Sequence, residues 1–141
     1  MTTSTPQFSS LRQKIAFEKQ ARLARNDRFR TDWAEACAAG DAAVSAMTPE
    51  PMVVTGREGS YFVEGGVCGF AQVQVRPRTS AFARWLIAQG IARSSDYYKC
   101  VYVSVSQFGQ SLQRKEAWAK AVADHLTAKG YDRVSWDSRI D

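Results

Sequence analysis

The segment that most constrains the fold is residues 65–76, GGVCGFAQVQVR, which has the alternation of a β-strand and begins with two glycines. Side chains alternate along a strand, so this segment has two distinct faces. One face carries Val67, Gly69, Ala71, Val73 and Val75. The other carries Cys68, Phe70, Gln72, Gln74 and Arg76. A small apolar face backed by a mixed one predicts a sheet that helices cover on one side and that is at least partly wet on the other.

Helix and strand signals alternate through the rest of the chain. Short strands are predicted at 52–55 and 60–63, a longer one at 99–106 and a last one at 133–136. Helices are predicted from Ser80 to about 89 and from Ser111 to about 129, each with a serine cap and a glycine just after its end. Strand–helix–strand order indicates crossover connections, and so parallel neighbours. We therefore predict an α/β domain, with α+β as the alternative, in two layers around a mixed, partly parallel sheet of about four to five strands.

The amino-terminal third reads as helical. Ser10 and Gln13 form a capping-box pattern that opens a helix over 11–29. Apolar residues at helical spacing predict a second helical stretch over 29–47, with Gly40 as a candidate break. Residues 48–51, TPEP, should end it, since proline disfavours helix in the residue before it. We predict a helical arm over residues 1–48 and an α/β domain over 49–141.

Composition narrows the class of protein. A chain of 141 residues with 45% apolar residues suits one domain with its own core. No apolar run reaches the roughly 18–20 residues that a membrane span needs. The sequence has no pattern of a secretory signal, so we expect no membrane partner and a cytoplasmic location.

Positive charge is concentrated in the arm. The chain has a net charge of +5, and residues 1–33 hold seven Lys/Arg against three Asp/Glu. Such an arm predicts an electrostatic partner, with nucleic acid as the first class to consider. Arg114 and Lys115, in the first turn of the helix that Ser111 caps, oppose the helix dipole and indicate an anion or partner contact, or a solvated face. The candidate binding residues are Arg12, Lys14, Arg22, Arg25, Arg28, Arg30, Arg76, Arg114 and Lys115.

Catalytic and metal signatures are weak. The cysteines at 37, 68 and 100 are widely spaced, and His125 is the single histidine, so we predict no metal and no cofactor. The glycine runs lack the spacing of phosphate-binding loops. Cys68 with His125 is the one possible Cys/His nucleophile pair, and it would need the two side chains within hydrogen-bond distance. A histidine at the edge of the core is the alternative that we favour.

One face of the predicted sheet has a second interpretation. Gln72, Gln74 and Arg76, with Tyr102 on a neighbouring strand, would form a polar and aromatic surface. Such surfaces bind single-stranded nucleic acid by stacking and phosphate contacts. The alternative is that helices of the arm cover this face, and we favour that alternative.

Four motifs carry a family resemblance: GVCGFA (66–71), FARWL (82–86), GQSLQRKEA (109–117) and SRID (138–141). In this order they resemble a group of small proteins of tailed bacteriophages and prophages, over about residues 52–141. The resemblance implies a phage gene product that acts in the infected bacterium, where small accessory proteins mostly work by binding. It assigns no role to any single residue.

These observations favour a non-enzymatic accessory protein that binds a host macromolecule through the basic arm and the α/β body. The target would be a nucleic acid, a nucleoprotein or a host defence complex. Two alternatives stay open: a small enzyme that acts on a nucleotide or other small ligand near Cys68, and a structural or assembly component of the virion.

Overall fold

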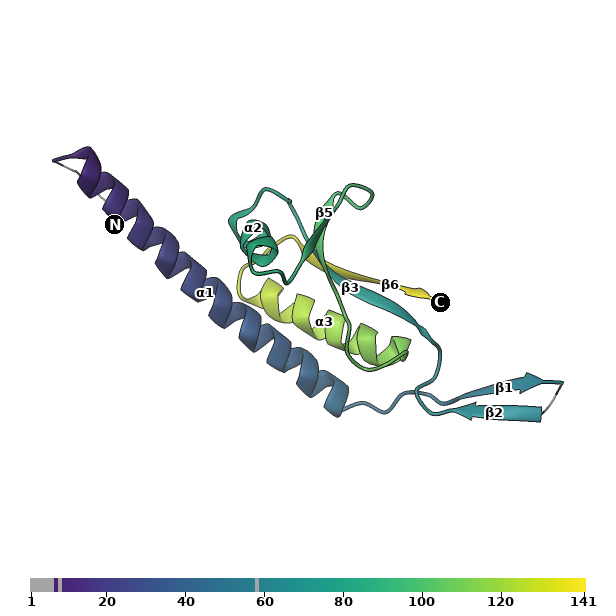
Figure 1. The fold of residues 1–141 in the computed structure, drawn as a ribbon. Helices are drawn as coiled ribbons and strands as arrows, with labels where there is room; N and C mark the ends of the chain where they lie inside the picture. Colours follow the sequence, from purple (N-terminus) through teal and green to yellow (C-terminus); the bar gives the residue numbers. More distant parts are fainter. Residues whose placement is uncertain (1–6, 8, 58) are drawn as a thin grey trace.

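The computed structural model describes residues 7, 9–57 and 59–141. Three helices and six strands alternate along the described residues (Figure 1). Their bounds are α1 (Leu11–Ser45), β1 (Met52–Gly56), β2 (Gly59–Val63), β3 (Gly69–Val75), α2 (Ala81–Ala88), β4 (Arg93–Ser95), β5 (Cys100–Ser104), α3 (Leu112–Ala128) and β6 (Val134–Ile140).

The strands form two antiparallel sheets, so the fold is α+β. The main sheet has four strands in the order β4-β5-β3-β6, and β1 pairs with β2 in a separate hairpin that projects from the body (Figure 1). The prediction of one mixed, partly parallel sheet is wrong. Strands joined by a helix do run in the same direction, but another strand lies between them: β5 separates β3 from β4, and β3 separates β5 from β6. This is a split β-α-β arrangement.

The helix boundaries follow the predicted caps. Ser80 and Ser111 accept hydrogen bonds from the backbone N–H groups of Ala83 and Arg114, three residues on in each case. Gly90 and Gly130 follow the helix ends with positive φ angles of 73° and 107°. The predicted caps and glycine ends are therefore confirmed. Each depends only on a few adjacent residues, so it can be recognised in the sequence.

Helix α1 is continuous over 35 residues, so the candidate break at Gly40 does not occur. Gly40 is buried against α3, where a Cβ atom would lie 2.7 Å from Nε1 of Trp118. The same indole Nε1–H donates to Asp41 Oδ1 at 3.1 Å. The glycine therefore allows a close helix–helix contact and does not interrupt the helix.

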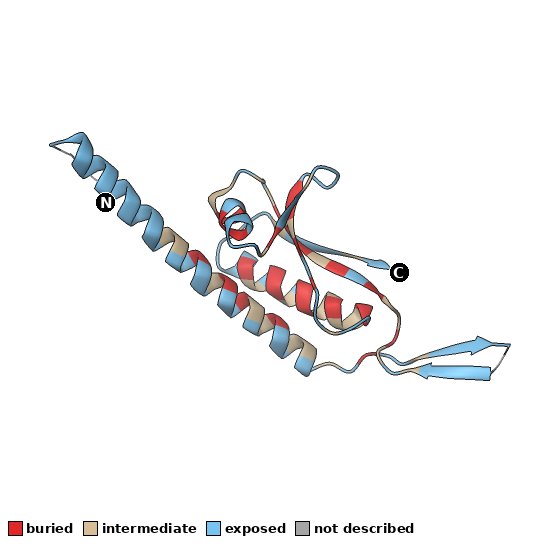
Figure 2. Cartoon of the chain, in the orientation of Figure 1, coloured by how far each residue is buried: buried red, intermediate tan, exposed pale blue. Residues whose placement is uncertain are grey.

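The core lies between the sheet and the helices. Ala71, Val73 and Val75 of β3 and Val101 and Val103 of β5 turn toward α2 and α3 and are buried (Figure 2). The second half of α1 joins this core through its aromatic residues. Phe29 lies 5.3 Å from Phe82 between ring centroids, and Trp33 meets Trp118 edge-on at 6.4 Å.

The predicted arm therefore has two parts with different surroundings. Residues 29–40 supply buried side chains to the core, whereas every residue from 11 to 24 is exposed and projects beyond the body (Figure 2). The domain boundary at residue 48 stays a prediction, but the core extends across it.

The second face of the sheet is open. Helix α1 packs on α3 and α2, which lie on the apolar face, and no helix among the described residues covers the other. The interpretation that the arm covers this face is wrong. The apolar residues of α1 pack against those of α2 and α3, and not on the polar strand face.

Candidate functional site

The open face takes alternate residues from all four strands of the main sheet. Gln74 is paired with Tyr102 of β5, which is also paired with Arg93 of β4. Phe70 lies opposite Arg139 of β6. Gln72 lies between Ser104 and Asp137. The register therefore gathers aromatic, amide and charged groups that are far apart in the sequence.

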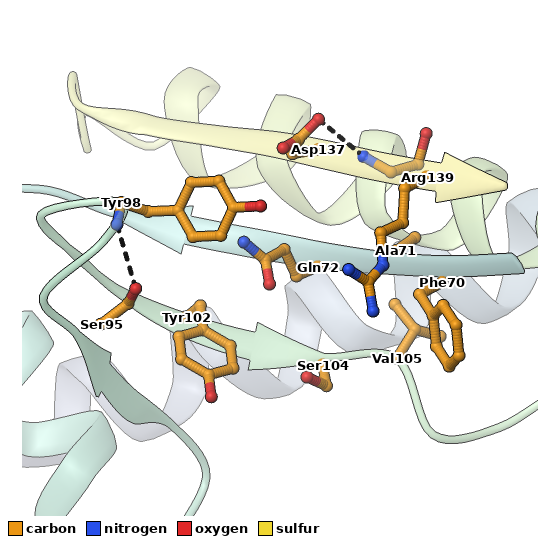
Figure 3. Close-up of a pocket in the computed structure, with 11 residues that line it drawn as sticks. Phe70, Ala71, Gln72, Ser95, Tyr98, Tyr102, Ser104, Val105, Asp137 and Arg139 are labelled. Atoms are coloured by element: carbon orange, nitrogen blue, oxygen red, sulfur yellow. Dashed lines mark hydrogen bonds between the residues drawn. The ribbon is translucent and has the colours of Figure 1, made fainter. Parts of the chain in front are cut away.

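Six of these residues line a hollow of about 300 Å³: Phe70, Gln72, Tyr102, Ser104, Asp137 and Arg139. Figure 3 shows Phe70 and Arg139 at one end, Tyr98 and Tyr102 at the other, and Gln72 between them. Phe70 and Tyr98 are 45% and 40% exposed, so a ligand can reach them. The volume is at the lower end of the range for small-molecule pockets.

The loop between β4 and β5 places Tyr98 at the hollow, and hydrogen bonds hold this loop in position. The Arg76 guanidinium donates to the Tyr98 carbonyl oxygen at 2.8 Å and to Gln74 Oε1 at 3.0 Å. The Tyr98 N–H donates to Ser95 Oγ at 3.1 Å. These hydrogen bonds fix the backbone of this loop relative to β3. Arg76 therefore has a structural role, because its guanidinium joins the loop to β3.

Arg78 secures the other side of the same loop. Its Nη1 donates to Asp96 Oδ1 at 2.7 Å. The hydrogen bond and the positive charge of Arg78 lower the pKa of Asp96 below its ordinary value. The carboxylate is therefore ionised at neutral pH and holds the loop through a charge-assisted hydrogen bond.

Two cations approach the ring of Phe70. The guanidinium carbon of Arg139 lies 5.1 Å from the ring centroid, and Lys115 Nζ lies 5.5 Å from it. Lys115 is buried and also donates to the Gly69 carbonyl oxygen at 3.1 Å. Lys115 therefore makes contacts within the protein, whereas Arg139 is exposed at the rim of the hollow.

The predicted basic residues do not form one surface. Arg12, Lys14, Arg22 and Arg28 are exposed on α1, which lies on the helix side of the sheet, away from the open face. Arg30 is also exposed and forms an ion pair with Asp27 at 2.7 Å. Arg25 is half-buried, with its guanidinium 5.9 Å from the Phe29 ring centroid. Arg114 lines a second hollow beside Cys68.

The exposed part of α1 is a charged rod about 20 Å long, at 1.5 Å per residue. It continues a docked helix, which supplies the nucleus that an isolated helix of this length would lack. A preformed helix with exposed arginines suits long-range attraction of an anionic partner.

The Cys68–His125 pair is not formed. The backbone of Cys68 forms an isolated antiparallel β-bridge with Ser111, at the start of α3. His125 is near the other end of that helix, about 21 Å further along its axis. Its Nε2 faces Glu35 Oε2 at 3.8 Å, at the edge of the core. The structure therefore separates the two groups that a thiol nucleophile of this kind would need.

Two further features, a cluster of metal-ligating side chains and a membrane-spanning helix, are absent from the described residues. Among residues 7, 9–57 and 59–141, no group of three or more His, Cys, Asp and Glu side chains is arranged to hold a metal ion. No helix in the same residues has the length and apolar character to cross a membrane.

Comparison with protein-family models, curated proteins and solved structures gives no match for this chain. Function is therefore inferred from the geometry of the open face and the charge of the arm.

Sequence reasoning missed several residues of the hollow. The predicted last strand ended at residue 136, whereas β6 continues to Ile140 and brings Asp137 and Arg139 onto the open face. The alternation of residues 134–140, VSWDSRI, could have predicted this extension. Tyr98 had no such signal, since a loop places it and contacts distant in sequence fasten that loop.

Proposed function

We propose that the protein binds nucleic acid and that the open face of the sheet takes the bases of a single-stranded segment. The observation that carries the proposal is the set of accessible aromatic rings around one hollow on an uncovered sheet. Four-stranded sheets with aromatic residues on their central strands stack two or three bases of single-stranded RNA. Phe70 and Tyr102 are on the two central strands, β3 and β5.

Each side chain has a chemical task in this arrangement. The rings of Tyr98, Tyr102 and Phe70 offer stacking surfaces, which tolerate any base because every base has a π-face. Gln72 and Ser104 can donate to and accept from base edges. Arg139 supplies a cation for a phosphate at the rim. A duplex presents phosphates and groove edges instead of free base faces, so the site favours single strands.

The arm adds an attraction that is independent of sequence. Its exposed arginines and lysines neutralise phosphates and release counterions, so binding weakens as salt rises. Because α1 packs on α3 and α2, on the helix side of the sheet, the arm and the open face act as two separate binding surfaces. We expect arm substitutions to weaken single-stranded and duplex binding alike, and open-face substitutions to weaken single-stranded binding selectively.

The phage resemblance supplies a setting for this activity. We propose a non-enzymatic bacteriophage accessory protein that acts in the cytoplasm of the infected host. Its target is a host nucleic acid or a nucleoprotein complex, with defence complexes as the natural class. The separation of Cys68 from His125 supports a binding role over thiol catalysis.

The test is fluorescence anisotropy with single-stranded RNA, single-stranded DNA and duplex DNA over a salt series. Tyr98→Ala and Tyr102→Ala should each weaken single-stranded binding by about 1–3 kcal/mol, which is about 5- to 150-fold. Tyr61→Ala is the matched control, because Tyr61 is an exposed tyrosine on the hairpin. Equal losses for all three variants, or no binding at low salt, would contradict the proposal.

The arm is tested by substitution and not by truncation, because removing α1 would also take Phe29 and Trp33 from the core. Replacing Arg12, Arg22 and Arg28 by alanine should make the salt dependence shallower, by about one unit of slope for each phosphate that the arm no longer neutralises. An unchanged slope would assign the arm's charge to another purpose.

A further inference from the structure

Strand β6 ends the main sheet with a free edge. Its inner edge pairs with β3, and no other strand within the described residues pairs with its outer edge. The Arg76 N–H donates to the Arg133 carbonyl at 3.0 Å, and the Asp141 N–H donates to the Cys68 carbonyl at 3.1 Å. Odd-numbered residues thus turn their backbone groups toward β3. Even-numbered ones, including Ser138, turn theirs outward.

The outward groups and side chains have the character of an interface. The Ser138 N–H donates only locally, to Asp137 Oδ1 at 2.9 Å. Trp136 and Ile140 are 36% and 70% exposed on the helix side of this edge. An extended edge with unpaired backbone groups and exposed apolar side chains is a template for another strand.

We propose that β6 pairs antiparallel with β6 of a second copy of this chain, about a two-fold axis at Ser138. In this register Asp137 lies opposite Arg139 of the second copy, and by symmetry Arg139 lies opposite Asp137 of the second copy. Trp136 lies opposite Ile140 of the second copy on the helix side. The strand is therefore complementary to itself in both charge and apolar character, as a two-fold interface requires.

The hydrogen-bond pattern fits the same register. Ser138 and the Trp136–Ile140 pairs carry the outward backbone groups, so they form the hydrogen-bonded pairs of the new ladder. Asp137 and Arg139 then form the non-hydrogen-bonded pairs, in which opposing side chains are closer. The Asp137 carboxylate leaves its local contact with the Ser138 N–H, which donates to the second copy.

Charge selects this register over its neighbours. Moving the axis by one residue places Asp137 opposite Asp137 or Arg139 opposite Arg139. Like charges directly opposite each other on a sheet are destabilising. Pairing at Ser138 joins the two main sheets edge to edge, so that their open faces form one continuous surface. This inference does not depend on what that surface binds.

The first measurement is the mass of the full chain in solution, by sedimentation equilibrium or light scattering, over roughly a hundredfold range of concentration. We expect a mass that approaches twice the 15.7 kDa of one chain at high concentration. A monomer at every concentration would overturn the proposal.

Charge variants then test the register. Asp137→Arg alone and Arg139→Asp alone each place like charges opposite each other, and each should raise the dimer dissociation constant by about tenfold or more. Mixing the two single variants in equal amounts restores opposite charges across the interface, so the mixture should form a heterodimer. Failure of the mixture to associate, with both variants folded by circular dichroism, would overturn the register.

A backbone variant gives an independent check. Ser138→Pro removes an outward N–H at the axis and leaves the odd-numbered hydrogen bonds to β3 in place. It should be monomeric while keeping the thermal unfolding transition of a folded domain. A dimer as stable as that of the unchanged chain would show that the copies meet elsewhere.

Discussion

The close contact between Gly40 and Trp118 predicts that Gly40→Ala destabilises the protein, the opposite of the usual effect in a helix. In an ordinary helix interior, Gly→Ala stabilises by about 1 kcal/mol. At Gly40 the added Cβ would lie 2.7 Å from both Cδ1 and Nε1 of Trp118, so the indole must move. Trp118 is buried and bonded to Asp41, which leaves little room for that movement.

Two costs oppose the helix gain. Overpacking a core by one methyl group costs about 1–3 kcal/mol. Loss of a hydrogen bond to the charged Asp41 costs about 1.5 kcal/mol more. After subtraction of the helix gain, Gly40→Ala should lower the free energy of unfolding by about 1.5–3.5 kcal/mol, a fall in Tm of about 5–12 °C.

Urea and thermal denaturation of the two proteins measure this difference. Ala34→Gly is the matched control, because Ala34 is exposed in the same helix and should lose about 1 kcal/mol through helix propensity alone. If Gly40→Ala instead gains about what Ala34→Gly loses, the close packing of α1 on α3 is refuted.

Three further predictions concern Leu126 and Cys37. Leu126→Ala should cost about 2–5 kcal/mol in urea unfolding, because Leu126 is fully buried, whereas Ile87→Ala on the exposed side of α2 should cost far less; equal costs would place Leu126 outside the core. Burial, with the charge of Asp41, raises the pKa of Cys37 from 9.0 to about 11. Iodoacetamide at pH 8 should therefore modify Cys37 more slowly than free cysteine, as read by mass spectrometry. Because the raised pKa favours the neutral thiol, the stability from this group is complete below about pH 9 and falls as pH rises through about 11. An unchanged pH dependence in Cys37→Ser would contradict this assignment.

The sequence predicted what depends on neighbouring residues. Serine caps and glycine ends bounded α2 and α3, and alternation assigned the apolar face of β3. Each of these signals acts over a few residues, where local geometry decides the structure.

The errors concern contacts between distant segments. A helical crossover tells that two strands run in the same direction, but not whether a third strand lies between them, as β5 does between β3 and β4. Gly40 has a purpose only when Trp118 is brought against it. The position of Tyr98 likewise depends on Arg76.

We propose that single-stranded bases lie on the open face of the sheet. The most direct test is ultraviolet cross-linking of the full chain to a single-stranded oligonucleotide, with the attached peptides identified by mass spectrometry. We expect cross-links at Phe70, Tyr98 and Tyr102, and their disappearance when unlabelled single strand competes. Cross-links confined to α1 or to the β1–β2 hairpin would contradict it.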